Sequence, residues 1–272
     1  QSIDASTIYD VPLLMQEEGL DTVTLEKLAL PNTTEPNLDQ WKEFLQRHKN
    51  PKDKVVIGLI GKYVELPDSY KSIQEAFIHA GATNEVEVEV KSIHSEHLSA
   101  KNIEKKLQGL DGILVAPGFG ERGIEGKVNA VTYARENNIP FLGICLGMQL
   151  LASEGTEGAP KDSVVTGLDL IPGRVDRLNV DPDLVLPHVG WNELHWHNPA
   201  CALAKGHPVG GDMYFVHSYE FIPKDNSVTA ATTDYASNIV CAVEKENIFG
   251  TQFHPEKSDK TGLKIIGNFI KL

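Results

Sequence analysis

Residues 140–149 read Pro-Phe-Leu-Gly-Ile-Cys-Leu-Gly-Met-Gln. Apolar residues typical of a strand run into Cys145, and residues 148–151 indicate the beginning of a helix. Gly143 and Gly147 flank the cysteine, where they leave room for a strained turn and for close approach of the helix to the strand. The pattern Gly-x-Cys-x-Gly therefore predicts a strand, a sharp turn that presents the thiol, and a helix.

A helix that begins beside the thiol would assist nucleophilic chemistry. Its unpaired N–H groups and positive dipole end favour a thiolate and can donate hydrogen bonds to an oxyanion formed next to it. The other interpretation is that Cys145 is a small buried core residue, as free cysteines usually are. A base elsewhere in the chain would decide between the two.

The candidate base lies far downstream, where residues 250–257 read Gly-Thr-Gln-Phe-His-Pro-Glu-Lys. A strand predicted over residues 248–253 ends there in a turn made by Pro255. Because His254 and Glu256 are two residues apart, the carboxylate can hydrogen-bond one imidazole nitrogen while the other nitrogen faces a thiol. Together with Cys145 they supply a nucleophile, a general acid and base, and a group that orients the base.

Composition narrows the class of protein. The 272 residues are 41% hydrophobic, enough for one large core with an appendage. The formal charge of −13 argues against nucleic acid or an anionic membrane as partner. Three widely spaced cysteines form neither a disulfide framework nor a zinc site, and the histidines at 188, 195 and 197 lack metal-ligand spacing, so we expect no metal and no cofactor. Without a membrane-spanning stretch or signal peptide, a cytoplasmic location is expected.

The chain divides by pattern into an N-terminal appendage or linker, residues 1–53, and a main domain, residues 54–272. In the first part of the main domain strands alternate with helices, which predicts an α/β fold with a parallel sheet covered by helices on both faces. The predicted strands are 55–61, 85–93, 112–116 and 140–145, and the predicted helices are 70–80, 101–107 and 127–137.

Beyond about residue 160 the strands become shorter and crossover helices are scarce, so an antiparallel extension of the sheet is expected. The strands predicted there are 168–178, 184–194, 213–219, 228–232, 239–244 and 248–253. A last helix over residues 261–272 would return to cover the sheet.

Taken together, Gly-Ile-Cys-Leu-Gly-Met-Gln at 143–149 and Gln-Phe-His-Pro-Glu at 252–256 resemble the class I glutamine amidotransferases. The resemblance implies the flavodoxin-like class I glutaminase fold. It also implies hydrolysis of L-glutamine through a cysteine thioester, with the ammonia passed to a synthase subunit or domain as partner.

The same resemblance implies roles for other residues. The glycine-rich loop 116–123 would face the nucleophile and supply an oxyanion donor. Because Pro117 has no N–H, that donor must be Gly118 or Phe119, and we expect Gly118 to act with Leu146. The alternative is that the loop is a simple tight turn.

Residues on three segments are candidates for binding the substrate glutamine. Gln149 lies one helical turn past Cys145, and Glu157 stands at the position where histidine-pathway members of the family bind the substrate ammonium. Alternatively, Gln149 packs within its helix and Glu157 is a solvated acid. Finally, His217, Ser218 and Tyr219 resemble the family segment that binds the substrate carboxylate through backbone and hydroxyl groups.

The two halves of the chain resemble different members of the family. Residues 1–150 resemble the glutaminase part of CTP synthase, notably in Gly-Lys-Tyr-Val-Glu-Leu-Pro-Asp-Ser-Tyr-Lys at 61–71 and Pro-Gly-Phe-Gly-Glu-Arg-Gly-Ile-Glu-Gly-Lys at 117–127. Later residues resemble the amidotransferase subunit of imidazole-glycerol-phosphate synthase, as in Pro-His-Val-Gly-Trp-Asn at 187–192 and Tyr-Phe-Val-His-Ser-Tyr at 214–219. In the latter relatives, residues matching Trp191, Tyr214 and Lys257 face the synthase barrel.

The chain therefore resembles a recombination of two class I amidotransferases. A free-standing amidotransferase fits the histidine pathway, where glutaminase and synthase are separate chains, so the barrel subunit of imidazole-glycerol-phosphate synthase is the expected ammonia acceptor. The alternatives are a glutaminase domain of CTP synthase, which serves a synthetase domain, an engineered chimera, or a catalytically silent scaffold that binds glutamine.

Overall fold

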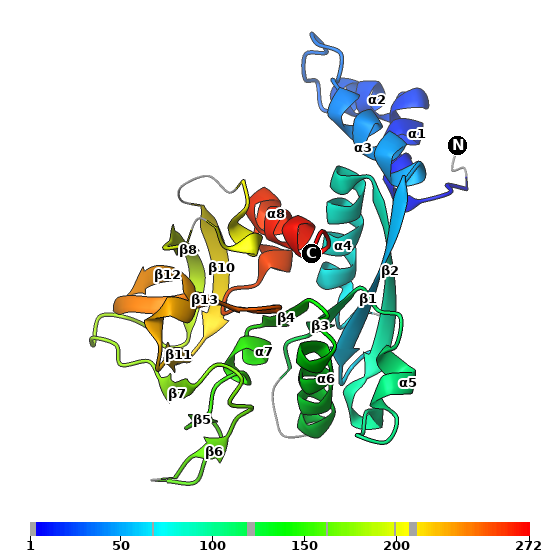
Figure 1. The fold of residues 1–272 in the computed structure, drawn as a ribbon. Helices are drawn as coiled ribbons and strands as arrows, with labels where there is room; N and C mark the ends of the chain where they lie inside the picture. Colours follow the sequence, from blue (N-terminus) through cyan, green and yellow to red (C-terminus); the bar gives the residue numbers. More distant parts are fainter. Residues whose placement is uncertain (1–3, 67, 119–122, 162, 199, 207–210) are drawn as a thin grey trace.

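A mixed sheet of eight strands forms the centre of the molecule (Figure 1). The computed structural model describes residues 4–66, 68–118, 123–161, 163–198, 200–206 and 211–272. The strand order of the sheet is β2-β1-β3-β4-β14-β13-β12-β9. The strands are β1 (Asp53–Gly61), β2 (Val86–His94), β3 (Gly112–Val115), β4 (Phe141–Ile144), β9 (His195–Trp196), β12 (Thr229–Tyr235), β13 (Ser237–Lys245) and β14 (Ile248–Thr251).

The pairing changes from parallel to antiparallel across this sheet. The five strands from β2 to β14 pair in parallel, whereas β13, β12 and β9 continue the sheet antiparallel. The expected parallel sheet with an antiparallel extension is therefore confirmed. The last strand, β14, lies inside the sheet next to β4, the strand that leads into Cys145.

Helices cover both faces of the parallel part. On one face α4 (Lys71–Asn84) and α8 (Asp259–Phe269) pack against each other. Phe77, with the helical spacing of Ile73 and Ala80, is fully buried there. The other face carries α5 (Ile103–Leu107) and α6 (Ile124–Glu136). The small residues Ala130 and Ala134 of α6 are fully buried there. The two faces thus hold two separate apolar clusters.

The second half differs in detail from the strands that periodicity predicts. Instead of one strand over 213–219, the chain forms β10 (Asp212–His217) and β11 (Tyr219–Pro223), which break at Ser218 and join different sheets. Strand β10 pairs with β8 (His188–Glu193), and β11 pairs with β7 (Gly173–Arg177) beside β5 (Glu154–Gly155) and β6 (Val165–Thr166). The alternation of side chains between the two faces of a strand continues unbroken across the bend. It therefore cannot reveal that the two strands pair with different neighbours.

Two expected strands are shorter than their apolar runs. The run 168–178 is strand only at Gly173–Arg177, after Asp169 with φ 53° and Pro172. The run 184–194 becomes strand only at His188, after Pro187, which lacks an N–H for the ladder. The helix expected at 127–137 begins earlier, at Ile124, and the helix expected at 261–272 spans Asp259–Phe269.

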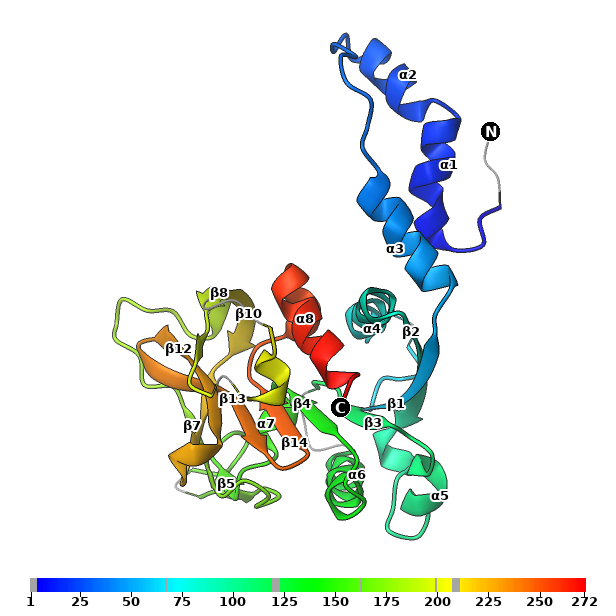
Figure 2. The same ribbon diagram turned by 45° about the horizontal axis from the view of Figure 1, so that its top comes forward.

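The N-terminal residues form three helices that project from the sheet beside α4 (Figure 2). These are α1 (Val11–Glu17), α2 (Leu20–Lys27) and α3 (Asp39–Lys49). Their attachment is aromatic: the ring of Phe44 stacks on His79 of α4 at 4.9 Å and meets Tyr9 edge-on at 5.2 Å. Trp41 donates its indole N–H to the Tyr9 carbonyl at 2.8 Å. We propose on this basis that residues 1–53 are an appendage held to the domain 54–272 by one aromatic cluster.

None of the helices in the described part of the chain is both long enough and apolar enough to cross a membrane.

The close approach of β4 to the helix after Cys145 depends on Gly143. A Cβ on Gly143 would come within 2.4 Å of the Gly147 carbonyl oxygen, and backbone cannot move aside as a side-chain tip can. We expect Gly143→Ala to lower the free energy of unfolding by about 1–3 kcal/mol, the usual cost of overpacking. Urea unfolding measures this. Gly190→Ala on β8, where a Cβ meets no atom within 4 Å, is the matched control and should be near neutral. Equal losses in both variants would contradict the steric argument.

Candidate functional site

The turn after β4 presents Cys145 as the sequence predicts. Cys145 has φ 54° and ψ −107°, a conformation that costs energy for a residue with a Cβ and that clusters at functional sites. Its N–H donates to the Thr251 carbonyl at 2.7 Å, which ties the turn to the end of β14. Helix α7 (Leu146–Gln149) follows directly. With only four residues it carries a small dipole, so its contribution is the free N–H groups of its first turn rather than a macrodipole.

His254 reaches this turn because β14 pairs in parallel with β4. Thr251 lies opposite Ile144, so the chain leaves both strands at the same edge of the sheet. There His254 Nδ1 lies 2.8 Å from Glu256 Oε1, and the two side chains are only 5% and 1% exposed. Ser258 Oγ donates to the His254 carbonyl at 2.6 Å, which holds the loop. The structure thus brings together the three residues predicted as a triad.

The electrostatics of the site favour a charged His254. Burial lowers its pKa, but the interactions with Cys145 and Glu256 outweigh burial and raise the pKa to about 9. Nε2 is buried without a partner in good hydrogen-bond geometry, so it is the nitrogen available to the thiol. The other cysteines differ: burial raises the pKa of Cys201 to about 12, and burial raises that of Cys241 well above its ordinary value.

A chain of amide contacts leads from the thiol into the protein. Gln252 Nε2 lies 3.6 Å from Cys145 Sγ, and Gln149 Nε2 donates to Gln252 Oε1 at 2.9 Å. Gln149 also approaches the Tyr219 carbonyl at 3.3 Å. Gln149 was predicted from the sequence to lie at this pocket, but Gln252, which is fully buried, was missed. The only feature of the sequence that could have indicated a role for Gln252 is its position between β14 and His254.

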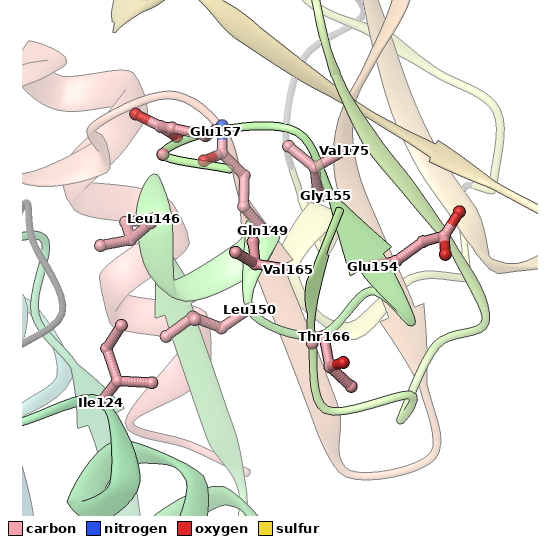
Figure 3. A pocket seen from close by; sticks show the side chains of 12 residues that line it. Ile124, Leu146, Gln149, Leu150, Glu154, Gly155, Glu157, Val165, Thr166 and Val175 are labelled. Atoms are coloured by element: carbon pink, nitrogen blue, oxygen red, sulfur yellow. The ribbon is translucent and has the colours of Figure 1, made fainter. Parts of the chain in front are cut away.

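A cavity of about 400 Å³ opens beside the nucleophile turn (Figure 3). Gln149 and Leu146 of α7 line it, together with Glu157, whose pKa burial raises. Figure 3 shows Gln149 and Glu157 at one end of the cavity and Ile124 at the other. The full lining comprises Ile124, Leu146, Gln149, Leu150, Glu154, Gly155, Glu157, Gly158, Val165, Thr166, Gly167 and Val175. The cavity thus offers Gln149 and Glu157 at one end, and Glu154 and Thr166 among apolar side chains elsewhere.

The segment at the end of β10 reaches the site through its backbone. The Val216 carbonyl lies 3.9 Å from Cys145 Sγ. The imidazole of His217 is engaged elsewhere, with Nδ1 2.8 Å from the Tyr219 carbonyl and Nε2 3.0 Å from His188 Nδ1. Burial also lowers the pKa of His217 to about 4. His188 is 1% exposed and its Nε2 contacts Asn192, which agrees with a satisfied histidine.

The candidate oxyanion donors lie on opposite sides of the turn. Leu146 is the first residue of α7, and Gly118 follows β3, while Phe119 lies outside the described residues. Two buried lysines contact the Gly118 segment, Lys62 at 5% and Lys127 at 2% exposure. Neither lysine was expected from the sequence to lie at the site, because lysine is normally a surface residue.

The three residues matched to a partner surface lie beside the triad. Trp191 of β8 is 52% exposed and meets the Tyr214 ring at 5.9 Å in a T-shaped contact. The Tyr214 carbonyl accepts a hydrogen bond from the His254 N–H at 2.9 Å. Lys257 is exposed next to Glu256. An exposed tryptophan and a half-buried tyrosine thus adjoin the buried histidine.

Across the described residues, no group of three or more His, Cys, Asp or Glu side chains is arranged to hold a metal ion.

Comparison with known proteins places part of the chain close to CTP synthases. The sequence is 70% identical over 154 residues to CTP synthase of Christiangramia forsetii and 71% identical over 154 residues to that of Flavobacterium psychrophilum. These matches cover 57% of this chain and only 28% and 29% of the relatives. The chain therefore spans less than a third of the length of these curated relatives.

Solved structures show the same fold. The glutaminase domain of Trypanosoma brucei CTPS, determined with bound acivicin, is 27% identical with a TM-score of 0.62, covering 80% of this chain and 94% of that domain. A Thermoplasma acidophilum protein described as part of a GMP synthase is 20% identical with a TM-score of 0.54, covering 80% of this chain and 92% of that one, and shows the fold alone. The sequence profile described as "Glutamine amidotransferase class-I" matches residues 65–272. The chain belongs to the class I glutamine amidotransferase family.

Proposed function

We propose that this chain hydrolyses L-glutamine to glutamate and ammonia with Cys145, His254 and Glu256 as its catalytic residues. The observation that carries the proposal is the convergence of two chain segments at one sheet edge. A strained turn presents Cys145 at the end of β4, and a buried His254–Glu256 pair lies at the end of the adjacent β14.

The reaction follows from the positions of these groups. Cys145 Sγ, having given its proton to His254, attacks the carboxamide carbon of glutamine, and Glu256 holds the imidazole by Nδ1. The tetrahedral oxyanion accepts hydrogen bonds from the N–H groups of Gly118 and Leu146. His254 then gives the proton to the leaving ammonia, which leaves a thioester. Water, deprotonated by His254, cleaves the thioester to glutamate and restores the thiol.

The cavity lined by Gln149 and Glu157 is the proposed binding site for glutamine. The Glu157 carboxylate would accept the substrate ammonium. The amide oxygen of Gln149 would hold the substrate from α7, since Nε2 is engaged with Gln252. Ser218 and the backbone from Val216 to Tyr219 would bind the substrate carboxylate. The His217 side chain fixes this segment instead of contacting the substrate, because both of its nitrogens are engaged.

For the ammonia acceptor, the comparisons favour the CTP synthase alternative over the histidine-pathway acceptor expected from the sequence. Two curated relatives about 70% identical are CTP synthases, and the T. brucei CTPS glutaminase domain covers 80% of this chain. We propose that the ammonia passes to a synthetase domain of the CTP synthase type. The matches to CTP synthases extend over 154 residues, or 57% of this chain. They do not test the origin of the other residues, so the chimera interpretation stays untested.

A barrel subunit of the imidazole-glycerol-phosphate synthase type is the second candidate acceptor. The exposed Trp191, in contact with the half-buried Tyr214, favours it, because the residues of that family at these positions face the barrel.

Replacement of the nucleophile tests the proposed activity. Cys145→Ala should lower glutaminase kcat by at least about 10³-fold, because no other group can form the thioester. The measurement is ammonia release from glutamine by the purified chain. Cys201→Ala, which removes a buried thiol that interacts with Glu244 and not with His254, serves as control and should retain activity. Glutaminase activity that persists in Cys145→Ala would refute the assignment, and an inactive but folded native chain would favour the silent scaffold.

The buried His254–Glu256 pair predicts a pH-dependent contribution to stability. The folded-state pKa of His254, about 9, lies above the ordinary value of 6.5. The stabilisation is therefore fully present below pH 6.5 and is lost as the pH rises through 9. Glu256→Gln should destabilise the fold by about 1.5–3 kcal/mol at pH 6, and by less at pH 9.

Urea unfolding of both proteins at pH 6, 7.5 and 9 measures this difference. Asp234→Asn, which breaks the exposed pair with His195, is the matched control and should change stability little at any pH. A loss in Glu256→Gln that is independent of pH would contradict the charged pair.

The acceptor is tested by stimulation of ammonia release. The chain is assayed alone, with a CTP synthetase domain and its nucleotides, and with the barrel of imidazole-glycerol-phosphate synthase and its ligand. We expect stimulation by the synthetase domain. Stimulation by the barrel alone, reduced several-fold in Trp191→Ala, would instead establish the second candidate.

A further inference from the structure

Two lysine side chains are buried next to the carboxyl ends of β1 and β3. Lys62 directly follows β1 and is 5% exposed, and Lys127 of α6 is 2% exposed. Lysine is almost never buried to this degree unless its charge is paired, because removal of an ammonium from water is costly. Among the residues that the structure describes, neither ammonium forms a salt bridge with a carboxylate. The Lys62 ammonium lies over the Tyr63 ring, 5.1 Å from the ring centroid, so it is the Lys127 charge that still needs a partner.

Lys127 holds the chain just before the candidate oxyanion donor. Its Nζ donates to the Ala116 carbonyl at 3.1 Å, two residues before Gly118. A Cβ on Gly118 would lie 3.9 Å from Lys127 Nζ and 3.4 Å from Lys62 Cε. Both lysine side chains thus contact the segment that leads from β3 to Gly118.

The nucleophile turn, which follows β4, lies beside this same end of β3. A Cβ on Gly147 would lie 3.0 Å from the Val115 carbonyl oxygen, so α7 packs directly on the last residue of β3. Lys127 is also within electrostatic reach of the thiol. Burial and the charge of Lys62 lower the pKa of Lys127 to about 8, whereas the interaction with Cys145 raises it. Lys127 thus binds the Ala116 carbonyl, next to the Val115 carbonyl against which α7 packs.

We propose that Lys127 is a positioning residue of the glutaminase site: its ammonium holds Gly118 against the nucleophile turn and stabilises negative charge at Cys145 and at the oxyanion. The inference rests on the proposed glutaminase function. Lys127 makes and breaks no bond in the reaction and moves no proton. Lys62 adds a second positively charged side chain next to Gly118. A purely structural lysine would satisfy the Ala116 carbonyl and leave the reactivity of the thiol unchanged.

The test compares Lys127→Met with Lys127→Arg in the full chain. The rate of alkylation of Cys145 by iodoacetamide is followed from pH 5.5 to 9.5, with the Cys145 peptide identified by mass spectrometry. Loss of the cation should move the midpoint of the pH profile up by about one unit, so that alkylation at a pH below both midpoints slows about tenfold. Arginine keeps the charge and should keep the midpoint. The buried Cys201 and Cys241 provide internal references.

Turnover provides the second readout. Glutaminase kcat should fall about tenfold in Lys127→Met at pH 7, with KM for glutamine changed less than about twofold, because the charge acts on the reaction and not on the ground-state complex. Lys105→Met on the exposed side of α5 is the matched control. An unchanged alkylation midpoint in a Lys127→Met protein with a native thermal transition would overturn the proposal.

Two further comparisons keep the outcome decisive. Where Lys127→Met does not fold, Lys62→Met is measured instead, since it removes one ammonium and leaves the Lys127 contact with Ala116. A smaller upward shift of the midpoint is expected, and no shift would overturn the proposal. Failure of the proposed function shows separately, as a native chain whose Cys145 is alkylated normally but which releases no ammonia.

Discussion

The parallel pairing of β14 with β4 is the constraint on which the site depends. It places the ends of two strands, distant in the chain, at the same edge of the sheet, and it ties Cys145 to β14 by the hydrogen bond from its N–H to the Thr251 carbonyl. The nucleophile turn and the His254 loop therefore share one rigid platform. Catalytic groups on such a platform are held close to their working geometry without the need for a mobile loop.

Burial then decides how these groups interact. The side chains of His254 and Glu256 are almost wholly shielded from solvent, so the attraction between them is screened little and the pKa of His254 rises in spite of desolvation. The same shielding makes the lysines at positions 62 and 127 significant. In water an ammonium near Gly118 would be screened, but a buried one interacts more strongly with charges around it. The one-turn helix α7 supplies only a few N–H groups, and the buried cations add to them.

The parts of the fold that could be predicted are those in which local pattern and tertiary environment agree. Helix α4 buries Phe77 on the face that its spacing indicates, and the strand before Cys145 is apolar throughout because both faces of the sheet are covered. The break at Ser218 could not be predicted, since the alternation of side chains runs through it while the backbone changes partner from β8 to β7. That break is what brings the Val216 carbonyl to the thiol.

The sequence by itself determined the family and the three residues of the proposed triad, because a cysteine between two glycines and a histidine two residues before a glutamate each carry a recognisable local chemistry. Only the tertiary structure decided which buried groups surround them. Gln252 and Lys127 have no local signature, and their roles arise from packing against residues remote in the chain. His217 shows the same limit: its motif placed it among the candidate site residues, but its imidazole contacts His188 and the Tyr219 carbonyl. Hydrogen bonds and charge interactions depend on the distances between atoms in the folded protein. The order of residues along the chain does not record these distances.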